Sequence, residues 1–257
     1  METWSVSVGF TDGSIKVVTL HQLRERNRGG FPVFLEPGVD HSSAALRALL
    51  QEPLRLRLRE LFSIDGFLPA HAVLSGQPVF VATSLNPPKN RRKSSEPLVP
   101  IMWRIEKPAY ENLWHFVHEV AEIELKLSGV REPRWLVEGI SQYSAYVYFK
   151  RNHPHWLEHV WRHYHVDERV DIDRFLNWGY EGLTIKGRTT NASLKDVLAW
   201  AVGQHATADE RRLYGTALEI FVDSFSGREE PRRLFEIARS GPDGISWIKE
   251  NLKRKGI

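Results

Sequence analysis

The chain has 257 residues, of which 42 % are hydrophobic and 26 % charged, a composition that excludes an intrinsically disordered protein. The formal net charge is only +3, and the two clusters of basic residues lie in loop-like stretches, which argues against a nucleic-acid-binding protein. The absence of cysteine excludes disulfides, thiolate metal sites and cysteine nucleophiles.

The sequence shows no pattern that predicts a signal peptide or a membrane-spanning helix. The N-terminal residues lack the basic and apolar regions of a signal peptide, and no apolar run approaches the ~20 residues that span a bilayer. We therefore expect a soluble, cytoplasmic protein that contacts neither a membrane nor nucleic acid. The oligomeric state stays open.

Residues 1–107 are predicted to be rich in β-structure with one helical segment. Alternating or short apolar runs predict strands over residues 4–10, 15–20, 78–83 and 98–105. Asp12 and Gly13 form a hairpin-turn signal between the first two strands. Helical spacing begins near His41 and resumes beyond a break at Pro53.

Residues 108–257 are predicted to be mostly helical. Pro108 suits the start of a helix, Gly129 ends it, and Pro133 begins a second helix that runs to about residue 150. Further helices are expected over residues 155–163, 193–201, 210–225, 231–239 and 245–253. Strands followed by helices predict an α+β fold, with both parts in one compact unit.

The helix after Pro108 carries His118-Glu119-x-x-Glu122. Residues four apart on a helix project the same way, so His118 and Glu122 can reach one point, with Glu119 beside it. Two ligands and a general base can be presented from one helix in this way. The next helix contains Trp135-Leu136-Val137-Glu138-Gly139.

These two motifs, in this order, resemble those of gluzincin zinc metallopeptidases, in which a helical His-Glu-x-x-His precedes a helix with Trp-Leu-x-Glu-Gly. The resemblance covers about residues 98–225. It implies a zincin-like fold, in which a small N-terminal mixed β-sheet packs on the active-site helix and the C-terminal half is mostly helical. The strand nearest the cleft pairs with an extended substrate in that family, and residues 98–105 would supply it. A peptide or protein is the implied partner.

The resemblance also implies roles for individual residues. Glu119 would be the general base, and zinc would be the cofactor. Three ligands leave a fourth position for a water, whose pKa zinc lowers to about 7. The implied ligands are His118, Glu122 and Glu138.

Tyr214 is the weaker candidate for a catalytic role. Residues 213–218 resemble the helix that supplies an oxyanion-binding tyrosine in several of these families, but Tyr214 would also suit the core face of an amphipathic helix. Gly215, in the middle of that helix, costs up to ~1 kcal/mol relative to alanine. It therefore indicates close packing or a nearby site.

Glu122 departs from the family motif, which has a second histidine at this position. A site with one histidine and two carboxylates is more anionic, and it suits Mn²⁺ or Fe²⁺ better than a two-histidine site does. Without a metal, clustered carboxylates repel each other and protonate. His115, one turn earlier, offers an alternative nitrogen ligand if the metal lies nearer the start of the helix.

Three hypotheses follow. The first is a metal-dependent peptidase. The second is a catalytically inactive pseudo-peptidase that serves as a binding or regulatory module and holds no metal; it predicts that Glu122 is hydrogen-bonded or paired with a cation. The third is an unrelated helical protein, in which His118 and Glu138 would lie far apart.

A histidine-rich stretch covers residues 153–165. His155, His159 and His163 repeat every four residues, so they share one stripe of a helix. A second metal site or a pH-sensitive face is one interpretation. The favoured one is an amphipathic helix whose histidines meet water, because the sequence implies no nearby carboxylate ligand. The acidic residues from 167 to 173 are interpreted as surface.

Overall fold

The computed structural model describes residues 3–10, 14–23, 33–40, 44–62, 71–74, 79–82, 101–104, 106–180 and 208–255. The chain divides into two compact units. The first comprises Met1–Arg57, Ile64–Phe116 and Gly182–Gln204, and the second comprises Leu58–Ser63, Val117–Glu181 and His205–Ile257. The units therefore interleave residues from both sides of the boundary that we predict after residue 107.

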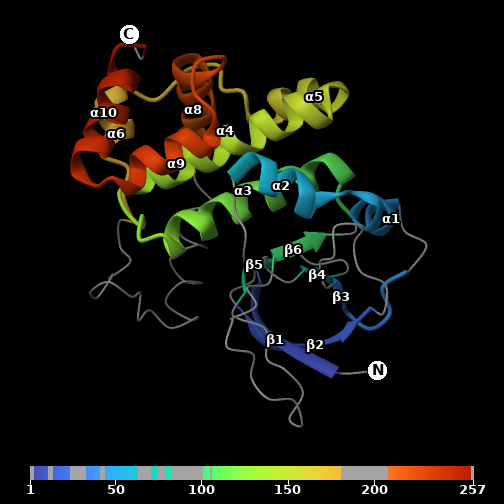
Figure 1. Cartoon of the computed structure of the whole chain (residues 1–257). Coiled ribbons are helices and arrows are strands. Elements are labelled where there is room, and N and C mark those ends of the chain that lie inside the picture. The colour runs from blue at the N-terminus through green and yellow to red at the C-terminus, as the bar shows by residue number, and fades with distance from the viewer. Residues whose placement is uncertain are drawn as a thin grey trace. The chain divides into compact units, whose positions relative to one another are not determined.

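The first unit is built on a six-stranded mixed sheet with the order β5-β1-β2-β3-β4-β6 (Figure 1). Its strands are β1 (Thr3–Phe10), β2 (Ile15–Gln22), β3 (Val33–Leu35), β4 (His71–Leu74), β5 (Val79–Ala82) and β6 (Ile101–Arg104). The pairs β1–β2, β1–β5 and β2–β3 are antiparallel, whereas β3–β4 and β4–β6 are parallel. β6 is thus an edge strand.

Alternation explains why β1 forms. Trp4, Val6 and Val8 are buried, while the serines between them are only half-buried, as expected for a strand with one core face. The Trp4 ring meets Phe34 of β3 edge-on, with ring centroids 5.0 Å apart. The predicted turn at Asp12 and Gly13 lies outside the described residues.

The apolar patterns of the sequence predict β1, β2, β5 and β6 but not β3 or β4. β3 has three residues and β4 has four, so neither is long enough to show a periodic pattern. The helical segment was predicted correctly. It forms α1 (Ala44–Gln51) and α2 (Leu54–Phe62), which are separated at Pro53.

The second unit is helical and centres on α4 (Arg134–Asn152). α4 packs against α5 (Pro154–Tyr164), α8 (Ala208–Phe225) and α9 (Pro231–Arg239), and Figure 1 shows it running between them. α10 (Pro242–Lys253) packs on α8 and α9. Nearly every α4 side chain as far as Phe149 is buried, which is the pattern of a helix surrounded by others.

The helix predictions and the α+β class are confirmed over the described residues. α3 (Ala109–Leu127) ends at Gly129, whose φ of 94° is left-handed. The Val130 N–H donates to the Leu125 carbonyl oxygen (2.9 Å) and the Gly129 N–H to that of Lys126 (3.2 Å), which is a Schellman motif. The helix predicted over residues 193–201 lies outside the described part of the chain.

Among the described residues, one short helix was not predicted. α6 (Ile172–Leu176) has five residues, and Asp171 caps it by accepting the backbone N–H groups of Asp173 (2.9 Å) and Arg174 (3.2 Å). Part of the acidic stretch that we interpreted as surface therefore begins a helix. The side chains of Asp167, Glu168 and Asp173 are exposed.

Two glycines allow close packing of α8. A Cβ on Gly139 of α4 would lie 2.1 Å from Cε2 of Phe221, so only glycine lets the two helices approach here. A Cβ on Gly215 would lie 2.4 Å from the Tyr164 carbonyl oxygen. The close packing predicted from Gly215 is confirmed, and Gly139 brings its neighbour Glu138 up to α8.

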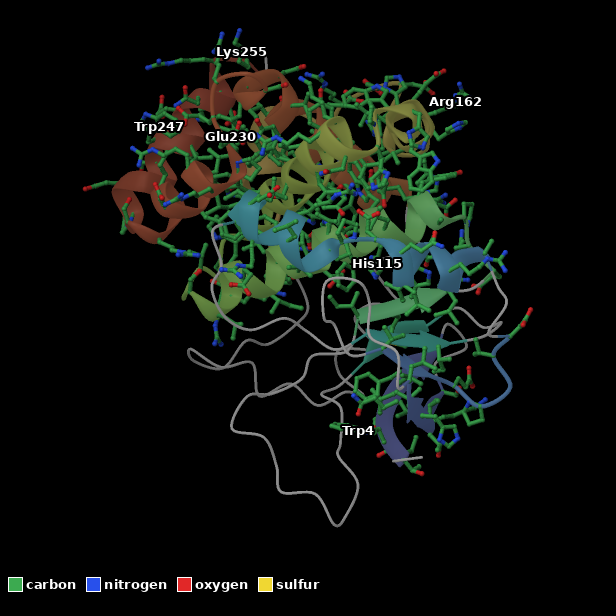
Figure 2. The ribbon with its side chains drawn as sticks, turned by 45° about the vertical axis from the view of Figure 1, so that its right-hand side comes forward. Trp4, His115, Arg162, Glu230, Trp247 and Lys255 are labelled. Atoms are coloured by element: carbon green, nitrogen blue, oxygen red, sulfur yellow. The ribbon has the colours of Figure 1, made fainter. Side chains whose placement is uncertain are left out.

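The histidine stripe of α5 lies at the surface. His155, His159 and His163 are exposed, whereas Val160 is buried. Arg162 also points outward from this helix (Figure 2). None of the three histidines belongs to a group of three or more potential metal ligands among the described residues. The amphipathic-helix interpretation is confirmed.

No helix among the described residues combines the length and the apolar character needed to cross a membrane. The cytoplasmic location stays a prediction.

Candidate metal centre

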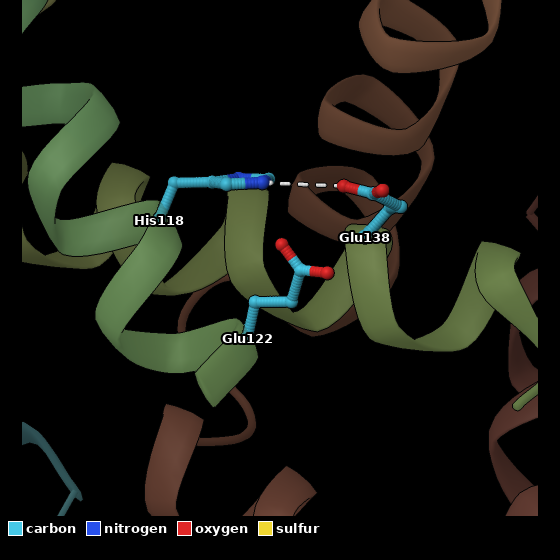
Figure 3. Close-up of side chains that lie close together, drawn as sticks. All are labelled: His118, Glu122 and Glu138. Atoms are coloured by element: carbon cyan, nitrogen blue, oxygen red, sulfur yellow. Dashed lines mark ion pairs between the residues drawn. The ribbon is translucent and has the colours of Figure 1, made fainter. Parts of the chain in front are cut away.

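Three potential ligands converge in the second unit. His118 and Glu122 come from successive turns of α3, and Glu138 comes from α4 (Figure 3). One ligand atom from each residue lies within 4.8 Å of the other two. The Schellman turn after α3 and the short connection to Arg134 bring the two helices back together, so helical spacing and a tight turn build the cluster.

His118 and Glu138 are in direct contact. His118 Nε2 lies 3.2 Å from Glu138 Oε2, and the two residues are only 7 % and 4 % exposed. The hypothesis of an unrelated helical protein required them to be far apart, and this expectation is wrong. No hydrogen-bond partner is found for Glu138 Oε2 or for His118 Nδ1 in the described part of the chain. The Nε2–Oε2 contact therefore has the distance of an ion pair without hydrogen-bond geometry.

An unsatisfied buried oxygen is the feature that fits a metal ion. Buried polar atoms almost always have a partner, and an oxygen without one indicates a missing ligand or an energetic cost. Imidazole nitrogen and carboxylate oxygen are both donors that zinc and other divalent metals accept. The donor set of His118, Glu122 and Glu138 thus suits a divalent cation.

Glu122 has a cation of its own. Its Oε1 accepts a hydrogen bond from Nζ of Lys126, one turn later on α3. Glu122 is half-buried, and Lys126 is partly exposed. The pseudo-peptidase hypothesis predicted a cation paired with Glu122, and Lys126 meets that expectation.

Glu138 is held by a buried network. Arg134 Nε donates to Glu138 Oε1 (3.4 Å), and the Tyr214 hydroxyl donates to the same oxygen (3.3 Å). Arg134 Nη2 donates to the Tyr214 oxygen (3.1 Å) and to Glu210 Oε1. Tyr214 therefore reaches the cluster, through Glu138.

The charges of the cluster shift the pKa values of His118 and Glu138 in opposite directions. Burial alone would disfavour both charged forms. For His118 the adjacent Glu138 carboxylate, helped by Glu119 and Glu122, outweighs burial and raises the pKa to about 9. For Glu138 the imidazolium of His118, helped by Arg134 and Lys126, outweighs burial and lowers the pKa to about 2. Without a metal, the two residues form a buried ion pair at neutral pH.

Glu119 lies beside the cluster and is not one of the three converging ligands. Burial, followed by repulsion from Glu122, raises its pKa to about 7. Burial and the Glu138 carboxylate raise the pKa of Tyr214 well above its ordinary value, so its hydroxyl stays protonated. His115 is exposed (Figure 2) and does not join the cluster.

Four residues of this network were not predicted from the sequence: Lys126, Arg134, Trp178 and Glu210. Helical spacing could have found the three charged ones, because each stands four positions from a predicted site residue: Lys126 from Glu122, Arg134 from Glu138 and Glu210 from Tyr214. Trp178 had no such signal. Its ring centroid lies 4.5 Å from Cζ of Arg134, a cation–π distance.

Comparisons of the chain with protein-family models, with curated proteins and with solved structures found no match. The interpretation of the site therefore depends on its own residues.

Proposed function

We propose that this chain is a metal-dependent peptidase of the gluzincin type with a zincin-like fold. The observation that carries the proposal is the convergence of His118, Glu122 and Glu138, whose ligand atoms lie within 4.8 Å of one another. Two helices supply them in the order that the motifs require. The unsatisfied Oε2 of Glu138 supports a cation at the same point.

The ligand set favours particular metals. One imidazole nitrogen and two carboxylates can hold zinc, and they suit Mn²⁺ or Fe²⁺ better than two imidazoles would. When bound, the metal would polarise the scissile carbonyl and acidify a water. Because His118 is protonated in the metal-free site, metal binding must release its proton.

The proton transfers belong to Glu119. Its pKa of about 7 suits a general base that accepts a proton from the attacking water and passes it to the leaving amine. The water oxygen forms a bond to the carbonyl carbon, the carbon–nitrogen bond breaks, and the amine leaves with the proton. Tyr214 keeps its own proton, and to stabilise the oxyanion its hydroxyl would turn from Glu138 Oε1, to which it donates in the metal-free site.

The proposed substrate is an extended peptide. Among the described residues β6 pairs only with β4, so one of its edges has no strand partner. An edge strand of this kind can hydrogen-bond an added peptide strand. β6 belongs to the first unit, and its pairing with a substrate stays a prediction from the family resemblance.

Metal content tests the proposal. We expect about one equivalent of zinc, manganese or iron in the wild-type protein by inductively coupled plasma mass spectrometry, and none in Glu138→Gln. Glu124→Gln is the matched control, because Glu124 is a buried carboxylate of α3 outside the cluster, and its metal content should not change. Peptide cleavage should be lost in Glu119→Gln while the metal is retained.

A pseudo-peptidase is the second candidate function, and two contacts favour it. Lys126 pairs with Glu122 and Arg134 pairs with Glu138, so both carboxylates already have cations. This protein would hold no metal even after incubation with excess zinc or manganese, although it is folded. That result would replace the peptidase proposal with a binding or regulatory module.

A further inference from the structure

Arg134 is a buried cation at the start of α4. Its side chain is only 2 % exposed, and it stands four residues before Glu138. Burying a guanidinium is costly unless charged and hydrogen-bonding partners compensate. The partners are Glu138, Tyr214 and Glu210. Tyr214 and Glu210 stand four residues apart on α8, and Arg134 and Glu138 stand four residues apart on α4. One turn of each helix therefore supplies this network where α4 packs on α8.

Arg134 and Tyr214 distinguish the two oxygens of Glu138. Both donate to Oε1, at 3.4 Å and 3.3 Å. Oε2 is the oxygen that lies 3.2 Å from His118 Nε2 and lacks a hydrogen-bond partner. A carboxylate whose first oxygen is held by two donors cannot rotate freely, so its second oxygen stays directed toward His118.

Arg134 itself is fixed by its surroundings. One arm of the guanidinium reaches Glu210, and its Cζ lies 4.5 Å from the Trp178 ring centroid, 5.4 Å from that of Tyr180 and 5.7 Å from that of Tyr214. Aromatic rings around a desolvated guanidinium stabilise its charge and restrict its movement. The position of Oε2 is thus set by a rigid group.

We infer that Arg134 is a positioning residue: with Tyr214 it holds Oε1 of Glu138 so that Oε2 is presented beside His118 as a ready ligand for a divalent cation. The inference rests on the proposed function for the cation, while the orientation of Glu138 can be tested without it. The planar fork of arginine is essential, because a lysine ammonium in its place cannot bind Glu138, Tyr214 and Glu210 in the same geometry.

The first test measures metal affinity. We expect Arg134→Lys, which keeps the charge, to bind Mn²⁺ or Zn²⁺ about 10- to 100-fold more weakly than wild type in calorimetric titrations, the usual cost of losing such a partner. Arg134→Met/Glu210→Gln removes both charges and guards against misfolding caused by an unpaired Glu210; it should show a similar loss. Arg169→Lys is the matched control, because Arg169 pairs with Glu219 of α8 outside the cluster, and its affinity should not change.

The second test uses the metal-free protein. A double-mutant cycle of His118→Gln and Glu138→Gln, measured by urea unfolding in EDTA, gives the coupling between these side chains. The same cycle in the Arg134→Lys background should show that the coupling is largely lost. Tyr214→Phe, which keeps the ring and removes one donor to Oε1, should reduce it less.

The outcomes separate the two proposals. If wild type binds metal and Arg134→Lys binds it equally well, the positioning role is wrong and the proposed function stands. If wild type binds no metal but the coupling depends on Arg134, the proposed metal site is wrong and the positioning role stands. A coupling that is the same in both backgrounds overturns the positioning role in either case.

Discussion

Two of the buried carboxylates of the second unit are equally hidden but have different hydrogen-bond partners. Glu138 and Glu219 are each 4 % exposed. Glu219 has a donor on both oxygens: His165 Nδ1 (2.9 Å) and the Val166 N–H (3.2 Å) contact Oε1, and Arg169 Nε (2.7 Å) contacts Oε2. Glu138 has two donors on Oε1 and none on Oε2.

This difference distinguishes a carboxylate that ties the fold together from one that can accept a ligand. Glu219 joins α8 to residues 165–169, and both of its carboxylate oxygens have partners there. In Glu138, Oε1 accepts the hydrogen bonds from Arg134 and Tyr214, while Oε2 lies beside His118. Glu138 Oε2 has no hydrogen-bond donor and lies beside His118 Nε2, and this difference is a stronger sign of a site than the shared burial is.

The largest effect should come from metal binding. A divalent metal at about 100 times its dissociation constant should stabilise the wild-type fold by about 2.7 kcal/mol, because it binds only the folded site. Thermal unfolding with and without EDTA measures this. Glu219→Gln should gain as much from the metal as wild type, and Glu138→Gln should gain nothing. Equal gains in all three proteins would remove the distinction between the two carboxylates.

The next effect is on the fold itself. Glu219→Gln should lower the free energy of unfolding by about 2 kcal/mol, because charge-assisted hydrogen bonds are lost, with allowance for the partial exposure of His165 and Arg169. Urea unfolding in EDTA checks this, and His165→Gln, which removes one donor at the surface, should cost clearly less. A neutral result for Glu219→Gln would show that its hydrogen bonds do not hold the fold.

A smaller change should follow from restoring the histidine that the family has at position 122. Glu122→His gives two imidazoles and one carboxylate, so the preference for Zn²⁺ over Mn²⁺ should rise by about tenfold, equivalent to about 1.4 kcal/mol. Competition titrations measure the ratio. Glu124→Gln, on the same helix, is the control. An unchanged ratio would mean that Glu122 is not a ligand and that its pairing with Lys126 is its main role.

Much of the site could be predicted because helical spacing is a local rule. His118 and Glu122 follow from residues four apart on one helix, and Glu138 follows from the second motif on the next. Arg134 and Glu210 could not be paired in this way, because they are 76 residues apart and meet only through the packing of α4 on α8. The side chain that orients Glu138 is thus a tertiary feature, although its spacing from Glu138 is local.

In the fold, too, elements set by local sequence patterns were predicted and elements set by tertiary contacts were not. The long helices of the second unit were predicted almost to their ends, since each has several turns of apolar periodicity and many begin at a proline. β3 and β4 were missed because strands of three and four residues are fixed by their neighbours in the sheet rather than by their own pattern. Short elements depend on tertiary contacts, and a single sequence does not reveal those contacts.

The smallest effect should be a pH dependence of the metal-free protein, which arises at Glu138 and not at Glu219. Because Glu138 raises the pKa of His118 to about 9 in the folded state, above its value of 6.5 when unperturbed, the pair stabilises the fold fully below about pH 6.5 and progressively less as the pH rises toward 9. The pKa of Glu138 is lowered to about 2, so the stabilisation that its ionised form contributes is lost only as the pH falls toward 2, outside this range. Between about pH 7 and 8 the loss that comes from His118 is at most about 1.4 kcal/mol, the limit for one proton. Glu119, whose pKa is raised to about 7, adds a smaller loss of the same sign.

Urea unfolding in EDTA at these two pH values checks the sign. Stability should fall from the lower pH to the higher in wild type and in Arg169→Lys. Glu138→Gln should lose most of this component, because Glu138 contributes more than Glu119 and Glu122 do to holding the proton on His118. A wild type that becomes more stable over this range would mean that His118 is neutral in the folded protein. It would then be ready for a metal without releasing a proton, and the ion pair would not be the resting state of the site.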